Sequence, residues 1–407
     1  KNRSTSRGET QKNMATKYKL MAAMAGGFEA VTARELMDMG YQTHNETGRV
    51  AFEGTMADVY RTNLWLRSAD RILIVLKEFK ALTFDDLFES VKAFPWEDWL
   101  PMTAHFPVTA KAVKSKLHSE PDIQSIAKKA IVERLSTYYH RRTRLPETGS
   151  TYHIDVRITK DEVRLTLDTT GESLFKRGYR AESAGAPLKE NFAAALVLLT
   201  RWHPEDMPFL DPTCGSGTIP IEAALLARNI APGIQRHFAF EEFQVFDPQE
   251  FAAQKEQAVA GQKNDPLMIF GQDIDQNMVE LSRTNAQKAG VLHDIRFKQL
   301  AVKDFKTSVP NGVIVANPPY GKRLSDAAGV HELYKQMGDV FRPLTTWSKY
   351  FLTSDLAFEN LYGAKATKRR KLYNGAMRVD FFQYWGKPDW KQPKALVTSL
   401  SDPVKED

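Results

Sequence analysis

The sequence predicts an α/β fold class, with a mixed α+β first half and a doubly wound parallel sheet in the second half. From about residue 187 onward, helical stretches alternate with short apolar runs, which is the pattern of a parallel sheet covered by helices. Three of these runs lead directly into glycine-rich, acidic or proline-rich motifs, as expected at the binding edge of such a sheet. The dipeptide Asn374-Gly375, a strong hairpin-turn signal, separates the last two runs.

The first half reads as two short mixed segments behind a polar leader, residues 1–16, which we expect to be disordered. Up to Gly54 the pattern is strand, helix, turn and strand, with Gly40 placed to end the helix. The next segment mixes helices and strands and closes with a hairpin. The predicted strands are 18–25, 49–52, 71–79, 152–158 and 162–168, and the predicted helices are 28–39, 84–94 and 125–139, with one more ending at Trp65.

The second half yields a parallel sheet finished by a C-terminal hairpin, which is the methyltransferase variant of the doubly wound plan. The predicted strands are 207–210, 267–270, 313–316 and 350–353, followed by the hairpin strands 370–373 and 378–384. The predicted helices are 188–201, 219–228, 276–289 and 330–341.

Cysteine content and hydropathy limit the class of protein. The 407-residue chain has one cysteine, Cys214, so neither an intrachain disulfide nor a multi-cysteine metal site can form. We expect Cys214 to be a small buried residue and not a nucleophile. No apolar run approaches the about 20 residues that cross a membrane, and no signal peptide is recognisable. We therefore expect a cytoplasmic protein with no membrane partner and no metal.

Basic residues concentrate in one segment of the first half. Between residues 111 and 144, nine basic residues stand against three acidic ones, an excess of +6 that equals the net charge of the whole chain. Such a segment fits a nucleic-acid contact, and a solvated helix face is the alternative. The candidate RNA contacts are Lys111, Lys114, Lys116, Lys128, Lys129, Arg141 and Arg142, with Arg369 and Arg370 in the last hairpin, where the charge could instead protect an edge strand.

The first motif is a glycine-rich loop, residues 211–217, between a short strand and a helix. Its two glycines let the backbone approach a ligand, and the helix N-terminus offers free N–H groups to a carboxylate. Pro220 replaces the third glycine of a dinucleotide loop, and no Gly-Lys-Ser/Thr is present, so a pyrophosphate or phosphate cradle is disfavoured. The pattern favours S-adenosylmethionine, with a plain tight turn as the alternative. The candidate cofactor contacts are Asp211, Thr213, Gly215, Ser216 and Gly217.

An acidic residue follows the next predicted strand of the second half. Asp273 lies nearest the strand end, where a carboxylate can bond both ribose hydroxyls of a nucleoside ligand, and it is a candidate cofactor contact. Asp275 is better placed to cap the helix that starts near Gln276. We expect Glu222, like Asp275, to be a helix-end residue.

The third motif, Asn317-Pro318-Pro319-Tyr320, is the most specific signal in the chain. The prolines restrict the backbone, so the Asn317 amide and the Pro318 carbonyl are predicted to form a rigid pair of acceptors. Acceptors that hold the hydrogens of a conjugated amino group would aim its lone pair at a sulfonium methyl. Tyr320 would stack on the base, which is worth about 1–3 kcal/mol. The candidate catalytic residues are Asn317, Pro318, Pro319 and Tyr320, with Asn317 also a candidate cofactor contact.

With these motifs in order, the chain resembles the THUMP-domain RNA methyltransferases, in particular the single-methyltransferase-domain bacterial form of the family that acts on guanine N2 of 23S ribosomal RNA. The resemblance covers nearly everything after Met14. Besides the three motifs above, it is carried by Ala25-Gly26-Gly27-Phe28-Glu29-Ala30, Gly171-Glu172-Ser173-Leu174-Phe175-Lys176-Arg177-Gly178-Tyr179-Arg180, Ala186-Pro187-Leu188-Lys189-Glu190-Asn191 and Lys368-Arg369-Arg370-Lys371-Leu372-Tyr373-Asn374-Gly375.

The resemblance implies S-adenosylmethionine as cofactor and RNA, 23S rRNA or a large-subunit precursor, as partner. It implies a ferredoxin-like domain at 17–55, a THUMP RNA-binding domain at 56–168, a linker at 169–186, a Rossmann-like methyltransferase domain at 187–390 and a tail at 391–407. By this resemblance, Gly215 and Gly217 of this chain would border the methionine part of the cofactor, with Asp211 nearby. Asp273 would bind the ribose, and Asn317, Pro318 and Tyr320 the target base. The family's acidic residue near adenine is missing, since residues 299–302 read Gln-Leu-Ala-Val and Asp304 comes later.

Other functions stay open at this point. Adenine-N6 methyltransferases of DNA or RNA share the Asn-Pro-Pro-Tyr motif. Methylation of a protein glutamine amide uses the same grip on an amino group, although the basic first half argues against it. An RNA-binding ribosome-assembly factor with a spent catalytic domain is the non-enzymatic alternative, and the intact motifs disfavour it. Arg177 and Arg180 could meet phosphates or form a domain-linking ion pair.

Overall fold

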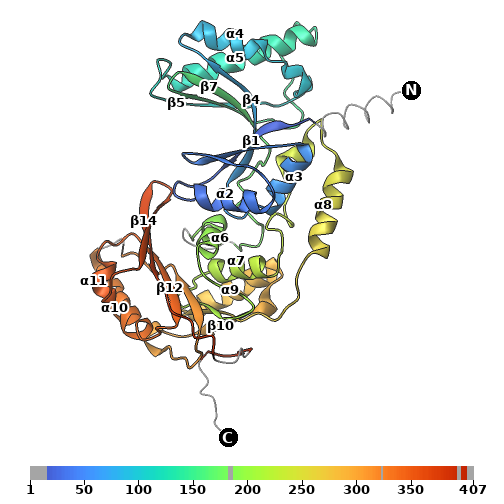
Figure 1. Ribbon diagram of the computed structural model, residues 1–407. Coiled ribbons are helices and arrows are strands. Elements are labelled where there is room, and N and C mark those ends of the chain that lie inside the picture. Colours follow the sequence, from blue (N-terminus) through green and yellow to red (C-terminus); the bar gives the residue numbers. More distant parts are fainter. Residues whose placement is uncertain (1–15, 182–186, 322–323, 392–395, 401–407) are drawn as a thin grey trace. The chain divides into compact units, whose positions relative to one another are not determined.

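The structure, a computed structural model, describes residues 16–181, 187–321, 324–391 and 396–400. The chain divides into two compact units: residues 1–24, 33–174 and 236–257 form the first, and residues 25–32, 175–235 and 258–407 form the second. Each unit is built on one seven-stranded sheet (Figure 1). Apart from Thr16, the predicted leader lies outside the described residues, as do parts of the predicted linker and tail.

The sheet of the first unit has the order β2-β3-β1-β4-β7-β6-β5, and all its neighbours are antiparallel except β5 and β6. Its strands are β1 (Tyr18–Ala23), β2 (His44–Glu46), β3 (Arg49–Gly54), β4 (Arg71–Lys80), β5 (Val108–Val113), β6 (Ile154–Thr159) and β7 (Glu162–Asp168). The helices of this stretch are α2 (Glu29–Asp38), α3 (Met56–Trp65), α4 (Phe84–Ala93) and α5 (Glu120–Tyr138). Because β4 pairs with both β1 and β7, one continuous sheet runs through the unit.

Side chains alternate across this sheet. On β6, Ile154, Val156 and Ile158 are buried, whereas Asp155 and Arg157 between them are only half-buried. The apolar face lies toward α5, which contacts β5 and β6 and packs on α4 (Figure 1). The opposite face of β6 therefore carries the polar side chains.

The sheet of the second unit has the order β10-β9-β8-β11-β12-β14-β13, parallel from β10 to β12 and antiparallel through the final hairpin. Its strands are β8 (Phe209–Asp211), β9 (Ile269–Asp273), β10 (Ile295–Gln299), β11 (Gly312–Ala316), β12 (Trp347–Thr353), β13 (Lys368–Asn374) and β14 (Met377–Tyr384). The helices after residue 175 are α6 (Glu190–Leu198), α7 (Thr218–Ala227), α8 (Pro248–Ala260), α9 (Gln276–Ala289), α10 (Leu324–Phe341) and α11 (Phe358–Tyr362). The predicted doubly wound sheet with a C-terminal hairpin is confirmed.

Some elements differ from their predicted bounds. The helix expected from residue 125 begins at Glu120, since Pro121 stands in its first turn, where no backbone N–H is needed. The strands β2, β5 and β10 and the helices α8 and α11 were not predicted, because they are short or show no clear apolar period in the sequence. None of the helices in the described ranges combines the length and apolarity needed to span a membrane.

The insertion between α7 and β9 belongs to the first unit over residues 236–257, although it falls within the stretch predicted as the methyltransferase domain. Aromatic contacts hold it there: Phe240 stacks on Tyr60 with ring centroids 4.6 Å apart, and Phe243 stacks on Tyr152 at 4.8 Å. Aromatic pairs of this kind contribute beyond the area they bury, so the insertion is an integral part of the first unit.

Candidate active site

The glycine-rich loop joins β8 to α7. Gly215 (φ 54°) and Gly217 (φ 85°) both have left-handed backbone conformations that favour glycine. A Cβ on Gly217 would lie 2.9 Å from the Cβ of Ser282, so this glycine is required for the close approach of α7 and α9. A Cβ on Gly215 would meet nothing within 4 Å. The backbone at Gly215 is therefore the part of the loop that is open to a ligand.

Asp273 ties the end of β9 to this loop. Its Oδ2 accepts a hydrogen bond from the Gly215 N–H at 2.9 Å, and its Oδ1 accepts one from the Asp275 N–H at 2.9 Å. A carboxylate has about four acceptor positions, so Asp273 keeps capacity for ligand hydroxyls. Asp275 caps α9 by accepting from the Asn277 N–H at 2.8 Å, as predicted.

Asp211 and Cys214 are two buried residues of this loop. Asp211 is 1% exposed and accepts a hydrogen bond from the Thr213 N–H at 3.1 Å. Burial raises the pKa of Asp211, and also that of the Cys214 thiol, well above their usual ranges. Neither residue lines a cavity at the loop. Cys214 is buried, as predicted, and in the resting fold its thiol is protonated.

A cavity of about 570 Å³, here called the glycine-loop cavity, opens beside the loop. Of the predicted cofactor contacts, it brings together Thr213, Gly215, Asp273 and Asn317. Its volume lies in the usual range for small-molecule sites. The lining residues that sequence reasoning did not assign as contacts include Ile274, Leu300, Ala301 and Val302. They offer apolar surface next to Asp273, whereas Asp304 is exposed and not part of the lining.

A second cavity of about 760 Å³, here called the hairpin cavity, is lined by Tyr320 and by Asn374 and Met377 at the turn of the C-terminal hairpin. Asn317 and Pro319 line both cavities. The loop after β11 therefore forms a shared wall, with one binding space on the side of Gly215 and another on the side of the hairpin.

This wall is held by two tyrosines. The Tyr320 hydroxyl donates to Asn317 Oδ1 at 2.5 Å, so the amide oxygen predicted to be a free acceptor is already engaged by its neighbour. The Tyr334 hydroxyl donates to the Pro319 carbonyl at 2.7 Å and lies 2.8 Å from Thr353 Oγ1. Burial raises the pKa of Tyr320, and raises that of Tyr334 to about 12, so both hydroxyls stay protonated.

Arginines of the predicted linker are engaged in ion pairs. Arg177 Nη2 lies 2.8 Å from Glu222 Oε1, with both side chains almost fully buried. Arg180 pairs with Glu190 and donates to Ser216 Oγ at 3.2 Å. Both arginines form ion pairs, but the partners Glu222 and Glu190 belong to the same unit, so these two pairs do not link domains as expected. The prediction that Glu222 is a helix-end residue is wrong, because Glu222 lies inside α7. Its carboxylate forms the ion pair with Arg177.

Some of the predicted RNA contacts form ion pairs, whereas others are exposed. Lys128 forms an ion pair with Glu147 at 2.6 Å, and Arg369 forms one with Asp380 at 2.8 Å. Lys111, Lys114, Lys116, Lys129 and Arg142 are exposed, and Arg141 and Arg370 are half-buried. Over the described parts of the chain, no three His, Cys, Asp or Glu side chains cluster in a way that could hold a metal ion.

Family models match three consecutive parts of the chain. They are the RlmL ferredoxin-like domain at residues 19–73, the THUMP domain at 81–168 and the RMKL-like methyltransferase domain at 177–381. The predicted order of ferredoxin-like, THUMP and methyltransferase domains is confirmed.

Curated relatives agree with this order. "Putative RNA methyltransferase YpsC" of Bacillus subtilis (strain 168) is 49% identical over 373 residues, which cover 91% of this chain and 97% of that protein. "Ribosomal RNA large subunit methyltransferase K/L" of Shewanella sp. (strain W3-18-1) is 32% identical over 370 residues, or 89% of this chain. The chain spans about half of that longer protein, 52%.

Solved structures give the same picture. SMU.472, "a putative methyltransferase complexed with SAH", is 50% identical with a TM-score of 0.86 and covers 92% of this chain and 99% of its own. A "predicted N6-adenine-specific DNA methylase" from Listeria monocytogenes str. 4b F2365 is also 50% identical, with a TM-score of 0.88 and coverage of 94% and 100%. The chain belongs to the RMKL-like methyltransferase family, with RlmL-type ferredoxin-like and THUMP domains ahead of its methyltransferase domain.

Proposed function

We propose that the protein transfers a methyl group from S-adenosylmethionine to an exocyclic amino group of an RNA base, with guanine N2 of 23S ribosomal RNA as the target. The observation that carries this proposal is the wall formed by Asn317 and Pro319 between the glycine-loop and hairpin cavities. A donor in the first cavity and a base in the second would meet at these residues. The THUMP domain and the names of the ribosomal RNA relatives favour RNA, in a cytoplasmic setting.

The glycine-loop cavity fits the cofactor. The open backbone at Gly215 suits the methionine part, and the remaining acceptor capacity of Asp273 suits the ribose hydroxyls. Ile274 and Leu300 provide apolar surface for the adenine ring. When bound, S-adenosylmethionine supplies an electrophilic methyl group on a sulfonium. SMU.472, with its SAH complex, supports this choice of cofactor.

On the acceptor side, the chain orients an amino group. An amide oxygen has two lone pairs, so Asn317 Oδ1 can accept from the Tyr320 hydroxyl and from a base amino group together. The Tyr320 bond fixes which way the amide faces, and the Pro318 carbonyl would take the second amino hydrogen. The prolines hold both acceptors in place, so the nitrogen lone pair points toward the glycine-loop cavity. Positioning of this kind can supply much of the reduction in the activation barrier of methyl transfer, with no need for a metal or a covalent intermediate.

Guanine N2 and adenine N6 are distinguished by experiment. The protein is incubated with methyl-labelled S-adenosylmethionine and unmodified total RNA, DNA or protein, and labelled RNA is then digested to nucleosides. We expect label in RNA, as N2-methylguanosine. Label in N6-methyladenosine, or in DNA, would favour the alternative that the name of the Listeria neighbour suggests. Binding of RNA without any transfer would favour a ribosome-assembly factor.

We also propose that the predicted parts act separately: residues 17–55 and 56–168 bind RNA, and residues 187–390 carry out the transfer. The exposed residues Lys111, Lys114, Lys116, Lys129 and Arg142 are then phosphate contacts. The ion pair between Lys128 and Glu147 makes Lys128 the weakest of the proposed contacts on α5.

A further inference from the structure

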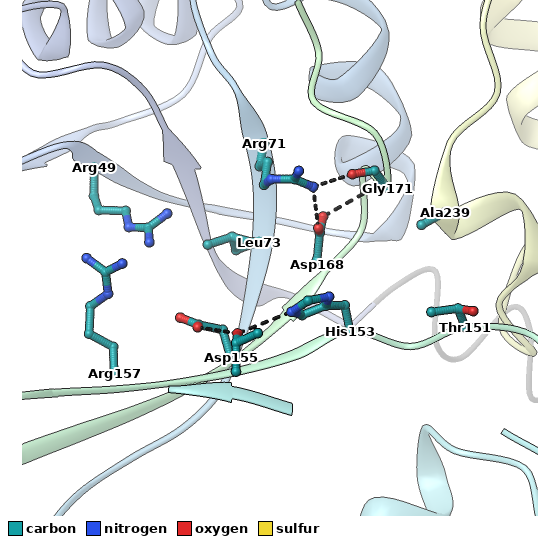
Figure 2. Close-up of a pocket in the computed structure, with 11 residues that line it drawn as sticks. Arg49, Arg71, Leu73, Thr151, His153, Asp155, Arg157, Asp168, Gly171 and Ala239 are labelled. Atoms are coloured by element: carbon teal, nitrogen blue, oxygen red, sulfur yellow. Dashed lines mark hydrogen bonds and ion pairs between the residues drawn. The ribbon is translucent and has the colours of Figure 1, made fainter. Parts of the chain in front are cut away.

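The polar face of the sheet in the first unit contains a cavity of about 460 Å³. Three arginines line it, each from a different strand: Arg49 on β3, Arg71 on β4 and Arg157 on β6. Figure 2 shows the guanidinium groups of Arg49 and Arg157 pointing toward each other. No motif marks this place in the sequence, because Arg49 and Arg157 are more than 100 positions apart along the chain.

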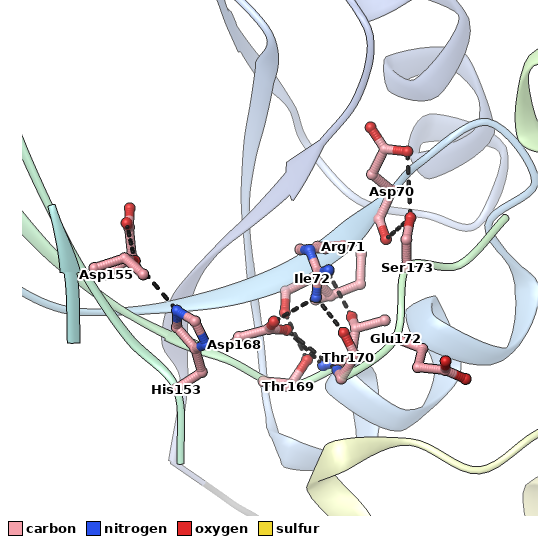
Figure 3. Close-up of polar contacts among 12 residues, drawn as sticks. Asp70, Arg71, Ile72, His153, Asp155, Asp168, Thr169, Thr170, Glu172 and Ser173 are labelled. Carbon is pink, nitrogen blue, oxygen red and sulfur yellow. Dashed lines mark hydrogen bonds and ion pairs between the residues drawn. The ribbon is translucent and has the colours of Figure 1, made fainter. Parts of the chain in front are cut away.

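Among the charged residues that line this cavity, Arg71 and Asp168 form an ion pair. Arg71 Nη1 lies 2.6 Å from Asp168 Oδ2, and Asp168 Oδ1 accepts from the Thr170 N–H at 2.8 Å (Figure 3). Asp155 also lines the cavity and accepts from the neutral Thr109 hydroxyl at 2.7 Å, and its negative charge acts on Arg49. Arg164 on β7 forms ion pairs with two carboxylates: its Nη1 lies 2.9 Å from Glu46 Oε2 and its Nε lies 3.0 Å from Glu78 Oε1.

The guanidinium groups of Arg49 and Arg157 lack such a partner. Within the described ranges, neither guanidinium has a hydrogen bond or an ion pair, and the Nε of Arg157 is shielded from solvent without a partner. Burial, and next the nearby charge of Arg157, lower the pKa of Arg49, although the charges of Asp155 and Glu46 act in the opposite direction. A half-buried guanidinium without a partner lowers stability, above all where one of its nitrogens is shielded from solvent, and so do two like charges that face each other. The arrangement is expected where an anion completes the site.

We propose that this cavity binds a phosphodiester group of the RNA substrate, held between the forked donors of Arg49 and Arg157. The proposal rests on the RNA substrate of the proposed function. Guanidinium groups match phosphate oxygens in pairs. Lys111 on β5 stands in register with Arg157 and is exposed, so the positive charge continues beyond the cavity along this face. A polyanion that follows the face therefore fits better than a small isolated anion.

The test compares two double variants of the full chain. Arg49→Gln with Arg157→Gln removes two charges from the cavity. Arg34→Gln with Lys80→Gln removes two exposed charges of the same unit that do not line it. Filter binding to an unmodified 23S rRNA fragment is measured across a NaCl series. We expect the cavity variant to bind about 10- to 100-fold more weakly and to lose about one to two units of salt slope. The control pair should lose less than about threefold.

The outcomes separate this inference from the proposed function. If the cavity variant binds RNA like the wild type, or if the wild type binds no RNA, the inference is overturned. If the wild type binds RNA through the cavity but transfers no methyl group, the inference stands and the proposed function fails. Urea unfolding of each variant serves as the check of folding, because the proposed cofactor site lies in the second unit and does not report on the first. Should the double variant unfold, Arg157→Lys keeps the charge without the fork, and unchanged RNA affinity in that variant overturns the inference.

Discussion

The two seven-stranded sheets place their polar residues differently. In the second unit, polar groups gather where parallel strands end, with the glycine loop after β8, Asp273 at the end of β9 and Asn317 after β11. In the first unit, they lie across an open sheet face, as Arg49 and Arg157 do. The carboxyl ends of parallel strands lie at one edge of the sheet. A single side chain at that edge can therefore contact the reacting groups and have a large effect on the rate. A sheet face spreads its contacts over many residues, and each contributes less.

The sharpest test of this contrast is Asn317→Ala, at the edge of the second sheet. The variant loses the amide oxygen that Tyr320 orients, so we expect methyl transfer to fall by about 10²- to 10³-fold or more. Cofactor affinity should stay within about twofold, since the Asp273–Gly215 contact remains. Single-turnover transfer and equilibrium cofactor binding measure the two effects. The matched control is Asn277→Ala, an exposed asparagine of α9. Loss of cofactor binding in Asn317→Ala would contradict the role assigned to Asn317.

Tyr320 sharpens the comparison by separating two roles of one side chain. Tyr320→Phe keeps the ring but loses the hydroxyl that donates to Asn317, and we expect transfer to slow by about 3- to 10-fold. Tyr320→Ala also loses the stacking face, worth about 1–3 kcal/mol, and should in addition weaken RNA saturation. The kcat and the RNA concentration at half-saturation are measured for both. Equal behaviour of the two variants would show that the ring does not contact the base.

Tyr334 tests whether the wall needs support from inside the unit. Its hydroxyl bonds the Pro319 carbonyl and Thr353, and it is fully buried. Tyr334→Phe leaves these partners unsatisfied, which should lower the free energy of unfolding by about 1–3 kcal/mol. We expect transfer to slow several-fold at constant cofactor affinity, because a small displacement of Asn317 misaligns the amino group. A loss of stability with unchanged kcat would reduce Tyr334 to a packing role.

The same contrast explains how far the sequence could predict the site. The loop at 211–217, Asp273 and Asn317–Tyr320 were recognisable because each motif is contiguous and follows a strand. Leu300 and Ala301 lie in the stretch that the resemblance places near adenine, but they were not assigned as contacts, because apolar residues that line a cavity resemble core residues in sequence. The pairing of Arg49 with Arg157 depends on strand order, which no local pattern reveals. Lys128 was chosen by charge density alone, and its partner Glu147 lies 19 positions away.

The smallest effect concerns a buried cation of the second sheet that, unlike Arg157, has partners. Lys349 on β12 is 6% exposed, and its ammonium donates to the Leu344 carbonyl at 2.9 Å and the Phe341 carbonyl at 3.2 Å. Burial nevertheless lowers the pKa of Lys349 from 10.5 to about 8. Between these values the unfolded chain keeps a proton that the folded chain has released. The unfolded state therefore binds more protons, and Lys349 makes stability rise with pH in this window.

Lys349→Met should remove that contribution. Free energies of unfolding by urea at pH 7.5, 8.5 and 9.5 give the slopes for the wild type, for Lys349→Met and for Lys335→Met, an exposed control on α10. We expect the wild-type slope to exceed that of Lys349→Met by up to about 1.4 kcal/mol per pH unit, with Lys335→Met like the wild type. Parallel curves for wild type and Lys349→Met would mean that the two carbonyls keep the ammonium charged. A buried cation with backbone partners would then lower the stability of the fold little. That result would sharpen the contrast with Arg49 and Arg157, whose guanidinium groups lack such partners and for which we propose a bound anion.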